Sequence, residues 1–514
     1  MKTKLFFTIA FSFLVSGVNA QLKFQKKYTN GGITLGYMVK QTNDGGYIIS
    51  GTSENIGAGV RDVYLIKTDA AGDTLWTRSY GGTSYDEGFS VEQTIDSGYI
   101  ITGYTNSFST SSEKVYLIKT NSTGDTLWTK TYGENLNGTG YSVKQTSDNG
   151  YIITGGQVDI NGTHNVLLMK TNTTGDTLWT KTFGGGGDDR GFSVTEAIGG
   201  GYVVAGNYST GGIYLVKTNL IGDTLWTKGY IVEGPPHINT GYSIQQTADL
   251  GYIVAGIAYG ASGVEGVALK TDVNGNFVWS KIYSGLSHVY INYGQQTTDG
   301  GYIFAGWSQS FPVGSYKSLL IKTDATGDTL WTKQYDGAGS IYNFNVQQTT
   351  DGGFVLVTAD NFNIFLTKTD SLGNSGCDQG AAWPVVTSIT PVITTPLPLF
   401  ASGGIVNAPA TQIARGGTII TLCINVGISE FSASGNSISI FPNPAEDNFM
   451  VSINAELINL QVEIFNVFGE KVYSAQLKSL QETINAKQFS SGIYFVKVSN
   501  GQNQYTKKLI IEQD

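Results

Sequence analysis

A few short segments combine acidic, basic, histidine and aromatic residues that could bind a ligand or perform catalysis. These candidate binding residues are Tyr85, Asp86, Glu87, Asp188, Asp189, Arg190, His237, His288, Tyr290 and Trp307. A pair of carboxylates can hydrolyse a glycosidic bond, and an indole ring can stack on a sugar or on a partner's side chain. Each feature also has a plainer interpretation. Trp307 could pack beneath its own loop, and Asp188–Arg190, which could also hold a cation or a basic partner, could be a solvated glycine-rich loop.

The elements that carry these residues belong to a repeat that occurs seven times. Each copy has a strand that ends in Gln-Thr in all but the fourth copy, then a turn, an apolar strand, a variable stretch, a Lys-Thr step and a glycine turn, and most copies end with a Trp strand. The lysines of the Lys-Thr step are Lys67, Lys119, Lys170, Lys217, Lys270, Lys322 and Lys368. A period of about 50 residues predicts a repeat architecture.

One copy shows what the repeat forms. Residues 88–94 alternate apolar and polar side chains, and residues 99–103, 115–120 and 126–132 make three further strands separated by turns and a loop. The unit is therefore a four-stranded antiparallel meander. Its middle strands are too apolar for an isolated sheet, and radial stacking of such sheets would cover both faces. We expect an all-β fold, a seven-bladed β-propeller of four-stranded blades.

The two ends of the repeat region predict how the ring closes. The seventh copy stops after Asn374 and lacks a Trp strand, whereas residues 22–32 resemble a fourth strand with its Gly-Gly exit and precede the first complete copy. The N-terminal strand should therefore complete the last blade.

The repeat resembles two known propeller families. The order of hydrophobic strand, Gly-Gly-Tyr, Val-Tyr-Leu-Ile and Trp is similar to a Kelch repeat, and residues 324–331 resemble the tryptophan-docking motif of quinoprotein propellers, shortened by one residue. Both resemblances cover about residues 22–375, support the fold and transfer no activity. Copper chemistry like that of galactose oxidase needs two histidines and a Tyr-Cys pair, but the chain has only His164, His237 and His288. We therefore assign no catalytic residue, no metal ligand and no cofactor.

Loop length predicts which face of the propeller binds a ligand. The loops that join strands one to two and three to four are short and uniform, whereas those that join two to three and four to the next blade vary in length and character. Function concentrates on variable loops held by a rigid frame, so we expect the site on the second face. The six repeated tryptophans should be structural, because a packing group is needed once per blade.

A second repeated pattern, Asp-Thr-Leu, could be a site of covalent modification at its threonine. It resembles the O-glycosylation sites of Bacteroidota, which implies possible glycans on Thr74, Thr126, Thr177, Thr224 and Thr329. The alternative is hairpin chemistry alone, because Gly-Asp and Thr suit a turn that enters a strand.

Composition and the N-terminus indicate export. With 40 acidic and 31 basic residues the formal charge is −9, and the basic residues do not cluster, so nucleic acid is not an expected partner. Residues 1–20 have lysines, an apolar run and small residues, which predicts a signal peptide cut before Gln21. We expect no transmembrane segment. Cys377 and Cys423 fit an oxidising compartment as a disulfide, and two unpaired thiols are the alternative.

The remaining chain divides into two parts. Residues 376–433 lose the repeat and contain five prolines, so they form either an extended spacer or a small irregular β element held by the possible disulfide. Residues 434–514 alternate strands and glycine turns, which predicts a small β-sandwich. The propeller itself should occupy residues 21–375.

The last segment closely resembles the type A C-terminal sorting domain of the Bacteroidota type IX secretion system. The shared motifs are Pro442-Asn443-Pro444, the Phe465-Asn466 segment ending at Gly469, the Tyr494 strand and the Lys507-Lys508-Leu509 ending. The resemblance implies that residues 434–514 engage the secretion machinery and that the protein is secreted or lies on the outer-membrane surface of a Gram-negative Bacteroidota cell. An ordinary immunoglobulin-like adhesion module is the alternative.

Together these observations predict a non-enzymatic binding protein whose variable propeller face takes a glycan or a protein ligand. Two alternatives stay open. One is a secreted polysaccharide hydrolase or lyase that uses loop carboxylates such as Asp86, Glu87, Asp188 or Asp189, and the other is a scaffold within an envelope complex.

Overall fold

The computed structural model describes residues 21–377 with gaps at 109–112, 134–136, 233–238, 261–262, 311–312, 336–344 and 361. It also describes the strands between 379 and 426, and residues 437–512 with gaps at 455–459, 467–469, 478, 480 and 500–503. Two compact units are present, one from Gln21 to Val426 and one that includes Gly427–Asp514. In the described residues the only helical element is a three-residue 3-10 turn, and no helix could cross a membrane.

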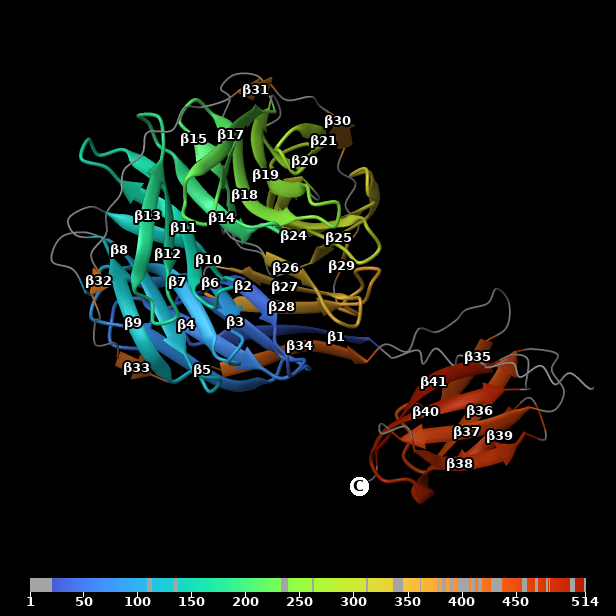
Figure 1. The fold of residues 1–514 in the computed structure, drawn as a ribbon. Coiled ribbons are helices and arrows are strands. Elements are labelled where there is room, and N and C mark those ends of the chain that lie inside the picture. The colour runs from blue at the N-terminus through green and yellow to red at the C-terminus, as the bar shows by residue number, and fades with distance from the viewer. Residues whose placement is uncertain are drawn as a thin grey trace, which may run out of the picture. The chain divides into compact units, whose positions relative to one another are not determined.

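The first unit is built from seven antiparallel sheets that follow one another along the chain (Figure 1). The first three sheets are β2 (Thr34–Gln41), β3 (Tyr47–Ser53), β4 (Asp62–Thr68) and β5 (Thr74–Gly81); β6 (Asp86–Gln93), β7 (Tyr99–Thr105), β8 (Lys114–Thr120) and β9 (Thr126–Tyr132); and β10 (Gly138–Gln145), β11 (Tyr151–Val158), β12 (His164–Thr171) and β13 (Thr177–Phe183). The next three are β14 (Arg190–Glu196), β15 (Tyr202–Tyr208), β16 (Gly212–Thr218) and β17 (Thr224–Ile231); β18 (Asn239–Gln246), β19 (Tyr252–Gly260), β20 (Gly263–Thr271) and β21 (Phe277–Ser284); and β22 (Val289–Gln296), β23 (Tyr302–Ser310), β24 (Val313–Thr323) and β25 (Thr329–Tyr335).

The seventh sheet joins the two ends of the repeat region. It contains β26 (Asn345–Gln348), β27 (Phe354–Ala359), β28 (Ile364–Thr369) and, from the N-terminus, β1 (Leu22–Thr29). β1 pairs antiparallel with β28, with Phe24 opposite Lys368 and Tyr28 opposite Ile364. The predicted all-β, seven-bladed propeller closed by the N-terminal strand is confirmed.

The Gln of each Gln-Thr motif links neighbouring blades into a complete circle. Its side-chain carbonyl accepts the backbone N–H of the turn in the preceding blade, as Gln93 does from Asn43 at 2.8 Å. The fourth blade uses Glu196 for the same contact, with Ser147. In the last step the N–H of Thr350, in the seventh blade, donates to Gln41 of the first at 2.9 Å. The circle of contacts is therefore closed between the two ends of the repeat.

The Trp strand and the glycine turn lock the outer parts of adjacent blades. Trp76 lies against Gly124 of the next blade, where φ is +77° and an added Cβ would come within 2.8 Å of the indole ring. Only glycine fits this position without strain. The Tyr80 hydroxyl donates to the Gly124 carbonyl at 2.6 Å, and Arg78 pairs with Asp125 at 3.3 Å. The Trp strand therefore packs between blades.

β1 reproduces these contacts although it lacks the tryptophan. Phe24 takes the place of the indole and meets Tyr47 at 6.1 Å between ring centroids. Lys26 pairs with Asp73 at 2.8 Å, and the Tyr28 hydroxyl donates to the carbonyl of Gly72 at 2.6 Å. The N-terminal strand thus supplies the same interblade contacts as a Trp strand.

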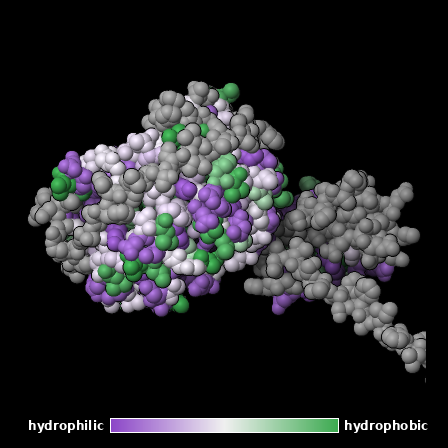
Figure 2. Space-filling model, turned by 45° about the horizontal axis from the view of Figure 1, so that its top comes forward, coloured by the Kyte–Doolittle hydropathy of each residue, from purple (hydrophilic) through white to green (hydrophobic). Residues whose placement is uncertain are grey.

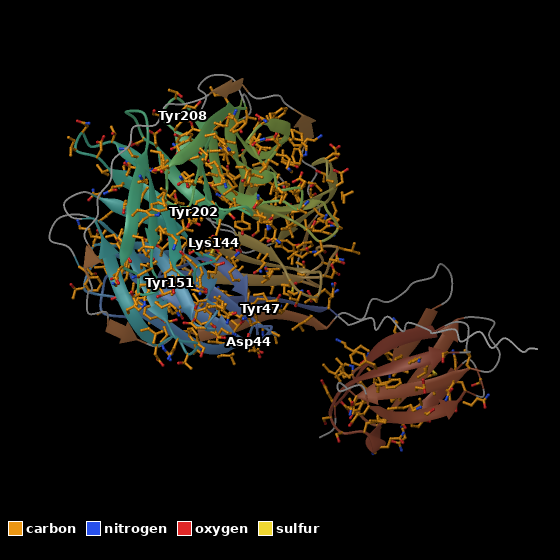
Figure 3. The ribbon with its side chains drawn as sticks, viewed as in Figure 1. Asp44, Tyr47, Lys144, Tyr151, Tyr202 and Tyr208 are labelled. Carbon is orange, nitrogen blue, oxygen red and sulfur yellow. The ribbon has the colours of Figure 1, made fainter. Side chains whose placement is uncertain are left out.

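In six blades the lysine of the Lys-Thr step forms an ion pair with an aspartate in the turn that joins the first strand to the second. In the first blade Lys67 Nζ lies 2.9 Å from Asp44 Oδ2 and donates to the carbonyl of Thr68 at 2.7 Å; Asp44 is labelled in Figure 3. The corresponding pairs are Lys119–Asp96, Lys170–Asp148, Lys270–Asp249, Lys322–Asp299 and Lys368–Asp351. Because each lysine is buried, its carboxylate partner compensates the lost hydration.

The fourth blade lacks the acidic partner. Its turn reads Ile198-Gly199-Gly200-Gly201, and Lys217 Nζ donates instead to the carbonyl of Gly200 at 3.0 Å. Burial lowers the pKa of Lys217 to about 8, because an ammonium group is costly to remove from water.

This depressed pKa predicts a local pH dependence of stability. Between about pH 8 and pH 10 the unfolded chain binds a proton at Lys217 that the folded chain has released, so the stability contributed by this site rises with pH. Replacing Lys217 by Met should raise the midpoint temperature of thermal unfolding at pH 7, by a change worth roughly 1–2 kcal/mol after discounting for solvent screening, and the gain should shrink by pH 10. Lys170→Met, which removes a paired lysine, is the matched control and should lower the midpoint. Equal pH profiles for Lys217→Met and the wild type would contradict the prediction.

After the seventh sheet the chain returns along the outer edges of the blades. Six strands each pair antiparallel with an outermost strand: β29 (Gln379–Gly380) with β25, β30 (Val385–Ser388) with β21, β31 (Val392–Thr394) with β17, β32 (Val406–Asn407) with β9, β33 (Gln412–Ala414) with β5 and β34 (Thr418–Val426) with β1. They visit the blades in reverse order and end on the seventh (Figure 1). We call residues 379–426 the belt. Its described strands pair with the propeller's edges and not with one another.

The second unit is a small β-sandwich. One sheet contains β35 (Ser437–Phe441), β36 (Asn448–Asn454) and β39 (Gln481–Asn485), and the other contains β38 (Lys471–Gln476), β37 (Gln461–Asn466), β40 (Gly492–Ser499) and β41 (Gln504–Ile511), with the turn η1 (Ala486–Gln488) following β39. Buried side chains from both sheets, including Phe449, Val462, Val496 and Leu509, form its core.

Candidate functional site

An axial cavity of about 150 Å³ lies among the innermost strands of the propeller. Its lining comes from β2, β6, β10, β14, β18 and β22, together with Asn345 at the start of β26. Figure 3 labels Lys144, on β10, near the middle of the ring of blades. Because every blade contributes its first strand to the axis, residues far apart in sequence meet there.

Five aromatic side chains make a continuous arc on the cavity wall. They are Tyr37, Phe89, Tyr141, Phe192 and Tyr242, each following a glycine in its strand. Consecutive ring centroids lie 5.0, 5.5, 5.1 and 5.1 Å apart. Sequence reasoning did not select these residues, although the recurring Gly-aromatic pair before Gln-Thr was available as a signal. Asn292 interrupts the arc in the sixth blade.

Polar groups complete the lining. Ser142, Ser193, Asn292 and Asn345 line the cavity. The hydroxyls of the two serines also accept N–H groups of the next blade, as Ser193 does from Ile244 at 3.2 Å. The cavity therefore offers aromatic faces beside a small number of amides and hydroxyls, the composition typical of small-ligand sites.

Tyr293, which lines the cavity, interacts with two lysines, Lys40 and Lys144. Lys40 Nζ is 3.5 Å from the Tyr293 hydroxyl, and Lys144 forms an ion pair with Glu92 at 3.5 Å. Burial by itself would raise the pKa of Tyr293, but the positive charges of Lys40 and Lys144 outweigh it and the pKa is lowered. The attraction of Glu92 outweighs burial at Lys144 and raises its pKa.

An ionic network connects the cavity to the variable face. The Tyr37 hydroxyl donates to Glu87 at 3.0 Å, and Arg61 donates to both Glu87 and Glu54 at 3.0 Å. Tyr85, predicted as a binding residue, is 42% exposed and lies under the Arg61 guanidinium, whose carbon is 5.8 Å from the ring centroid. The sequence candidates Tyr85 and Glu87 thus meet Arg61, which sequence reasoning did not select.

The predicted carboxylates Asp86 and Asp189 are buried and hold loops together. Asp86 accepts from the N–H of Gly82 at 2.9 Å and from the Ser107 hydroxyl at 2.6 Å, and Asp189 accepts from backbone N–H groups of the equivalent loops. Burial raises the pKa of both carboxyls. They lie on β6 and near the start of β14 with the β10 sheet between them, so the fold does not bring them together as a catalytic pair.

Asp188 and Arg190 meet His164 on the exposed part of the same face. His164 Nδ1 lies 2.9 Å from Asp188 Oδ1, and an Arg190 Nη2 nitrogen lies 3.2 Å from His164 Nδ1. The pKa of Asp188 is lowered, chiefly by its hydrogen bond with His164. The predicted residue His237 lies outside the described residues.

Trp307 is a packing residue in the sixth blade. It is 7% exposed, stacks on Tyr290 at 4.0 Å between centroids with the planes 13° apart, and meets Tyr316 at 5.3 Å. The neighbouring His288 accepts the N–H of Val264 at 3.0 Å. Since its ring is covered, Trp307 presents no open face to a sugar. The packing alternative weighed from the sequence matches this arrangement.

Four of the five Asp-Thr-Leu threonines have hydroxyl oxygens that are buried in the fold, namely Thr126, Thr177, Thr224 and Thr329. Glycosylation of the Asp-Thr-Leu threonines stays a prediction. The adjacent leucines are exposed, as Leu127 is by 57%. Hydrophobic residues form small separate patches among hydrophilic ones on the visible propeller surface in Figure 2.

Within the described residues, no group of three or more His, Cys, Asp or Glu side chains is placed to hold a metal ion. Any cation site in this part of the chain would therefore need hydroxyl or carbonyl oxygens in addition to carboxylates.

Among curated proteins, the chain is 28% identical over 92 residues to an endo-acting ulvan lyase of Formosa agariphila, which is 17% of this chain and 17% of the lyase. The chain therefore matches about a sixth of that relative, and 92 residues cannot span the seven sheets.

Similar solved structures include a protein of unknown function from Bacteroides caccae (13% identity, 61% of this chain and 94% of that chain, TM-score 0.35). Another is PorZ, described as an essential surface component of the type IX secretion system of Porphyromonas gingivalis (11% identity, 92% of this chain and 51% of that chain, TM-score 0.30). These distant likenesses carry no functional argument.

The family match lies in the second unit. Residues 439–512 match the family model of the secretion system C-terminal sorting domain, and they include all seven strands of the sandwich except the first residues of β35. This agrees with the Pro-Asn-Pro and Lys-Lys-Leu motifs noted in the sequence. The chain is therefore a protein exported by the type IX secretion system of a Bacteroidota cell to the cell surface or the medium, with a seven-bladed propeller ahead of its sorting domain.

Proposed function

We propose that the propeller is a non-enzymatic binding module that takes a glycan at the mouth of its axial cavity, on the face of the variable loops. The observation that carries the proposal is the aromatic arc from Tyr37 to Tyr242, set beside Asn292 and Asn345. Aromatic faces stack on the C–H surface of a sugar ring, and amides bond to its hydroxyls. The network through Glu87 and Arg61 extends this site onto the exposed face.

The size of the cavity favours binding over cleavage. About 150 Å³ is comparable to the volume that holds one small ring in an engineered cavity. A polymer threaded past two catalytic groups would need more room. The buried carboxylates Asp86 and Asp189 are also committed to loop contacts, which favours a binding role for this face.

A polysaccharide lyase is the second candidate. Tyr293 has a lowered pKa beside Lys40 and Lys144, and a phenolate next to ammonium groups could abstract a proton while a cation holds the substrate carboxylate. The short similarity to an ulvan lyase belongs to this alternative. A protein ligand or an envelope scaffold is the third.

The purified full chain tested against a panel of neutral, uronic and sulfated polysaccharides separates these functions. Retention without product is the result we expect, and Phe192→Ala should weaken it by roughly 5- to 150-fold because it removes a stacking face worth roughly 1–3 kcal/mol. Ile160→Ala, at a side chain 90% exposed on a loop, is the control and should bind normally. Unsaturated product that disappears in Tyr293→Phe would instead establish the lyase. Neither retention nor product would point to a protein partner.

A further inference from the structure

Two buried carboxylates face each other at the junction of the first and second blades. Asp62, the first residue of β4, is 1% exposed and Asp86, the first residue of β6, is 0% exposed. A Cβ placed at Gly81 would lie 2.0 Å from Asp62 Oδ1 and 2.5 Å from Asp86 Oδ2. The two oxygens can therefore be no more than 4.5 Å apart, the sum of those distances. Two buried like charges this close repel strongly unless something neutralises them.

The charged side chains around the junction do not neutralise this pair. Arg61, the neighbouring cation, is bound to Glu54 and Glu87 at 3.0 Å each. The site therefore has more negative charge than the described residues around it compensate.

Three oxygens at the junction have no hydrogen-bond partner. They are Asp62 Oδ1, Asp86 Oδ1 and Ser79 Oγ, and each is buried. A Cβ at Gly57 would lie 2.0 Å from Asp62 Oδ2 and 2.9 Å from Ser79 Oγ, so the hydroxyl lies beside the carboxylate. A Cβ at Gly59 would lie 2.7 Å from the carbonyl oxygen of Gly82 and 3.3 Å from Asp62 Oδ1. A second carboxylate, a hydroxyl and a backbone carbonyl thus each lie close to the Asp62 carboxylate.

The junction of the third and fourth blades provides an internal comparison. There Asn165 replaces the first carboxylate, and a Cβ at Gly184 would lie 2.0 Å from Asn165 Oδ1 and 2.7 Å from Asp189 Oδ2. Both oxygens of Asp189 accept backbone N–H groups, from Gly185 at 2.8 Å and Ser209 at 2.6 Å. The same geometry with one carboxylate is satisfied by the protein alone.

We propose that Asp62, Asp86 and Ser79 bind a calcium ion that fastens the loop of residues 54–61 to the entry of the second blade. Calcium takes carboxylate, carbonyl and hydroxyl-type oxygens in flexible geometry, and a divalent ion neutralises both carboxylates. The loop it fixes carries Arg61, which contacts Glu87 and covers Tyr85. The ion therefore orders one edge of the variable face, independently of whether that face binds a glycan.

The test uses the purified full chain stripped with chelator and titrated with calcium chloride by calorimetry, with unfolding temperatures measured in parallel. We expect a saturable calcium signal of one ion per chain and a rise of several degrees in the unfolding temperature. Asp62→Asn, which copies the arrangement at Asn165, should weaken calcium binding at least tenfold and abolish the rise. Asp188→Asn, at an exposed carboxylate of the same face, is the control and should respond as the wild type does.

Ser79→Ala guards against a folding defect in Asp62→Asn, because it removes one ligand with little change in volume, and it should weaken calcium binding several-fold. The proposal is overturned if the chain shows no calcium signal, or if Asp62→Asn and Ser79→Ala bind calcium like the wild type. It is also overturned if calcium does not change the unfolding temperature of the wild type and Asp62→Asn raises that temperature equally with and without calcium. That result would indicate that the two carboxyls share a proton and bind no ion.

Discussion

Deletion of residues 427–514 will abolish export and leave the propeller in the periplasm. The reason is that residues 439–512 match the sorting domain family and form a sandwich with its own core. Cutting after Val426 leaves β34 paired along β1, from Leu22 opposite Val426 to Thr29 opposite Thr418. The truncated protein should therefore fold and resist protease while it fails to reach the surface.

The measurement is quantitative immunoblotting of periplasm, surface and medium from cells that make the full or truncated chain. A surface substitution in the sorting unit, Lys487→Ala, removes an exposed ion pair with Asp447 and is the matched control; it should be exported normally. Undiminished surface signal from the truncated chain would mean that another part of the protein directs export. Loss of the protein from every fraction would indicate that the truncated chain is degraded. A folded, protease-resistant pool in the periplasm would indicate instead that the chain folds but is not exported.

The blades were predictable because their contacts repeat. The strands and the number of blades follow from the spacing of the Lys-Thr steps and from the Gly turns. The closure of the ring follows from the incomplete first and last copies, and the structure shows it in the pairing of β1 with β28, where Phe24 lies opposite Lys368. Such features come from local turn chemistry and strand alternation, which one sequence displays seven times. The Trp strand also follows from repetition, although its contact with a glycine of the next blade could be seen only in the fold.

The candidate site was less predictable because its residues are defined by closure of the ring. Tyr37 and Tyr242 belong to one arc only after five blades have been placed around an axis. Loop variability drew attention to Tyr85 and Asp188, which are exposed, and equally to Asp86 and Glu87, which are buried, and it did not distinguish the two kinds. The exposure of a side chain depends on which face of its strand packs against the next blade. In β6 a register shift between Gly88 and Ser90 interrupts the regular alternation of side chains between the two faces.

The belt could not be inferred from composition. Prolines and β-branched residues suit a spacer as well as short edge strands, and its strands are only two to nine residues long. What defines them is the row of unpaired backbone groups on the outermost strand of each blade. A belt strand satisfies these groups and covers an edge that could otherwise pair with another chain.

The second large effect is expected from the cysteines that frame the belt. Cys377 is disulfide-bonded, and Cys423, whose backbone pairs with Gln25 of β1, is the only other cysteine in the sequence. We propose that they join each other, so that the belt returns to the blade from which it started and is closed around the propeller. A closed loop of about 45 residues stabilises the fold by about 4 kcal/mol in the chain-entropy model.

Replacing both cysteines by serine should therefore lower the unfolding temperature by roughly 5 °C for a unit of this size, and proteases should cut the belt before the blades because short edge strands then open independently. The measurement is thermal unfolding and limited proteolysis of the full chain, with the wild type in reducing agent as the matched comparison, which should behave like the double variant. An intact mass two hydrogens below that of the reduced chain would verify the bond. Two thiols that react in the native protein, with no change in unfolding temperature on reduction, would show instead that strand pairing alone holds the belt in place.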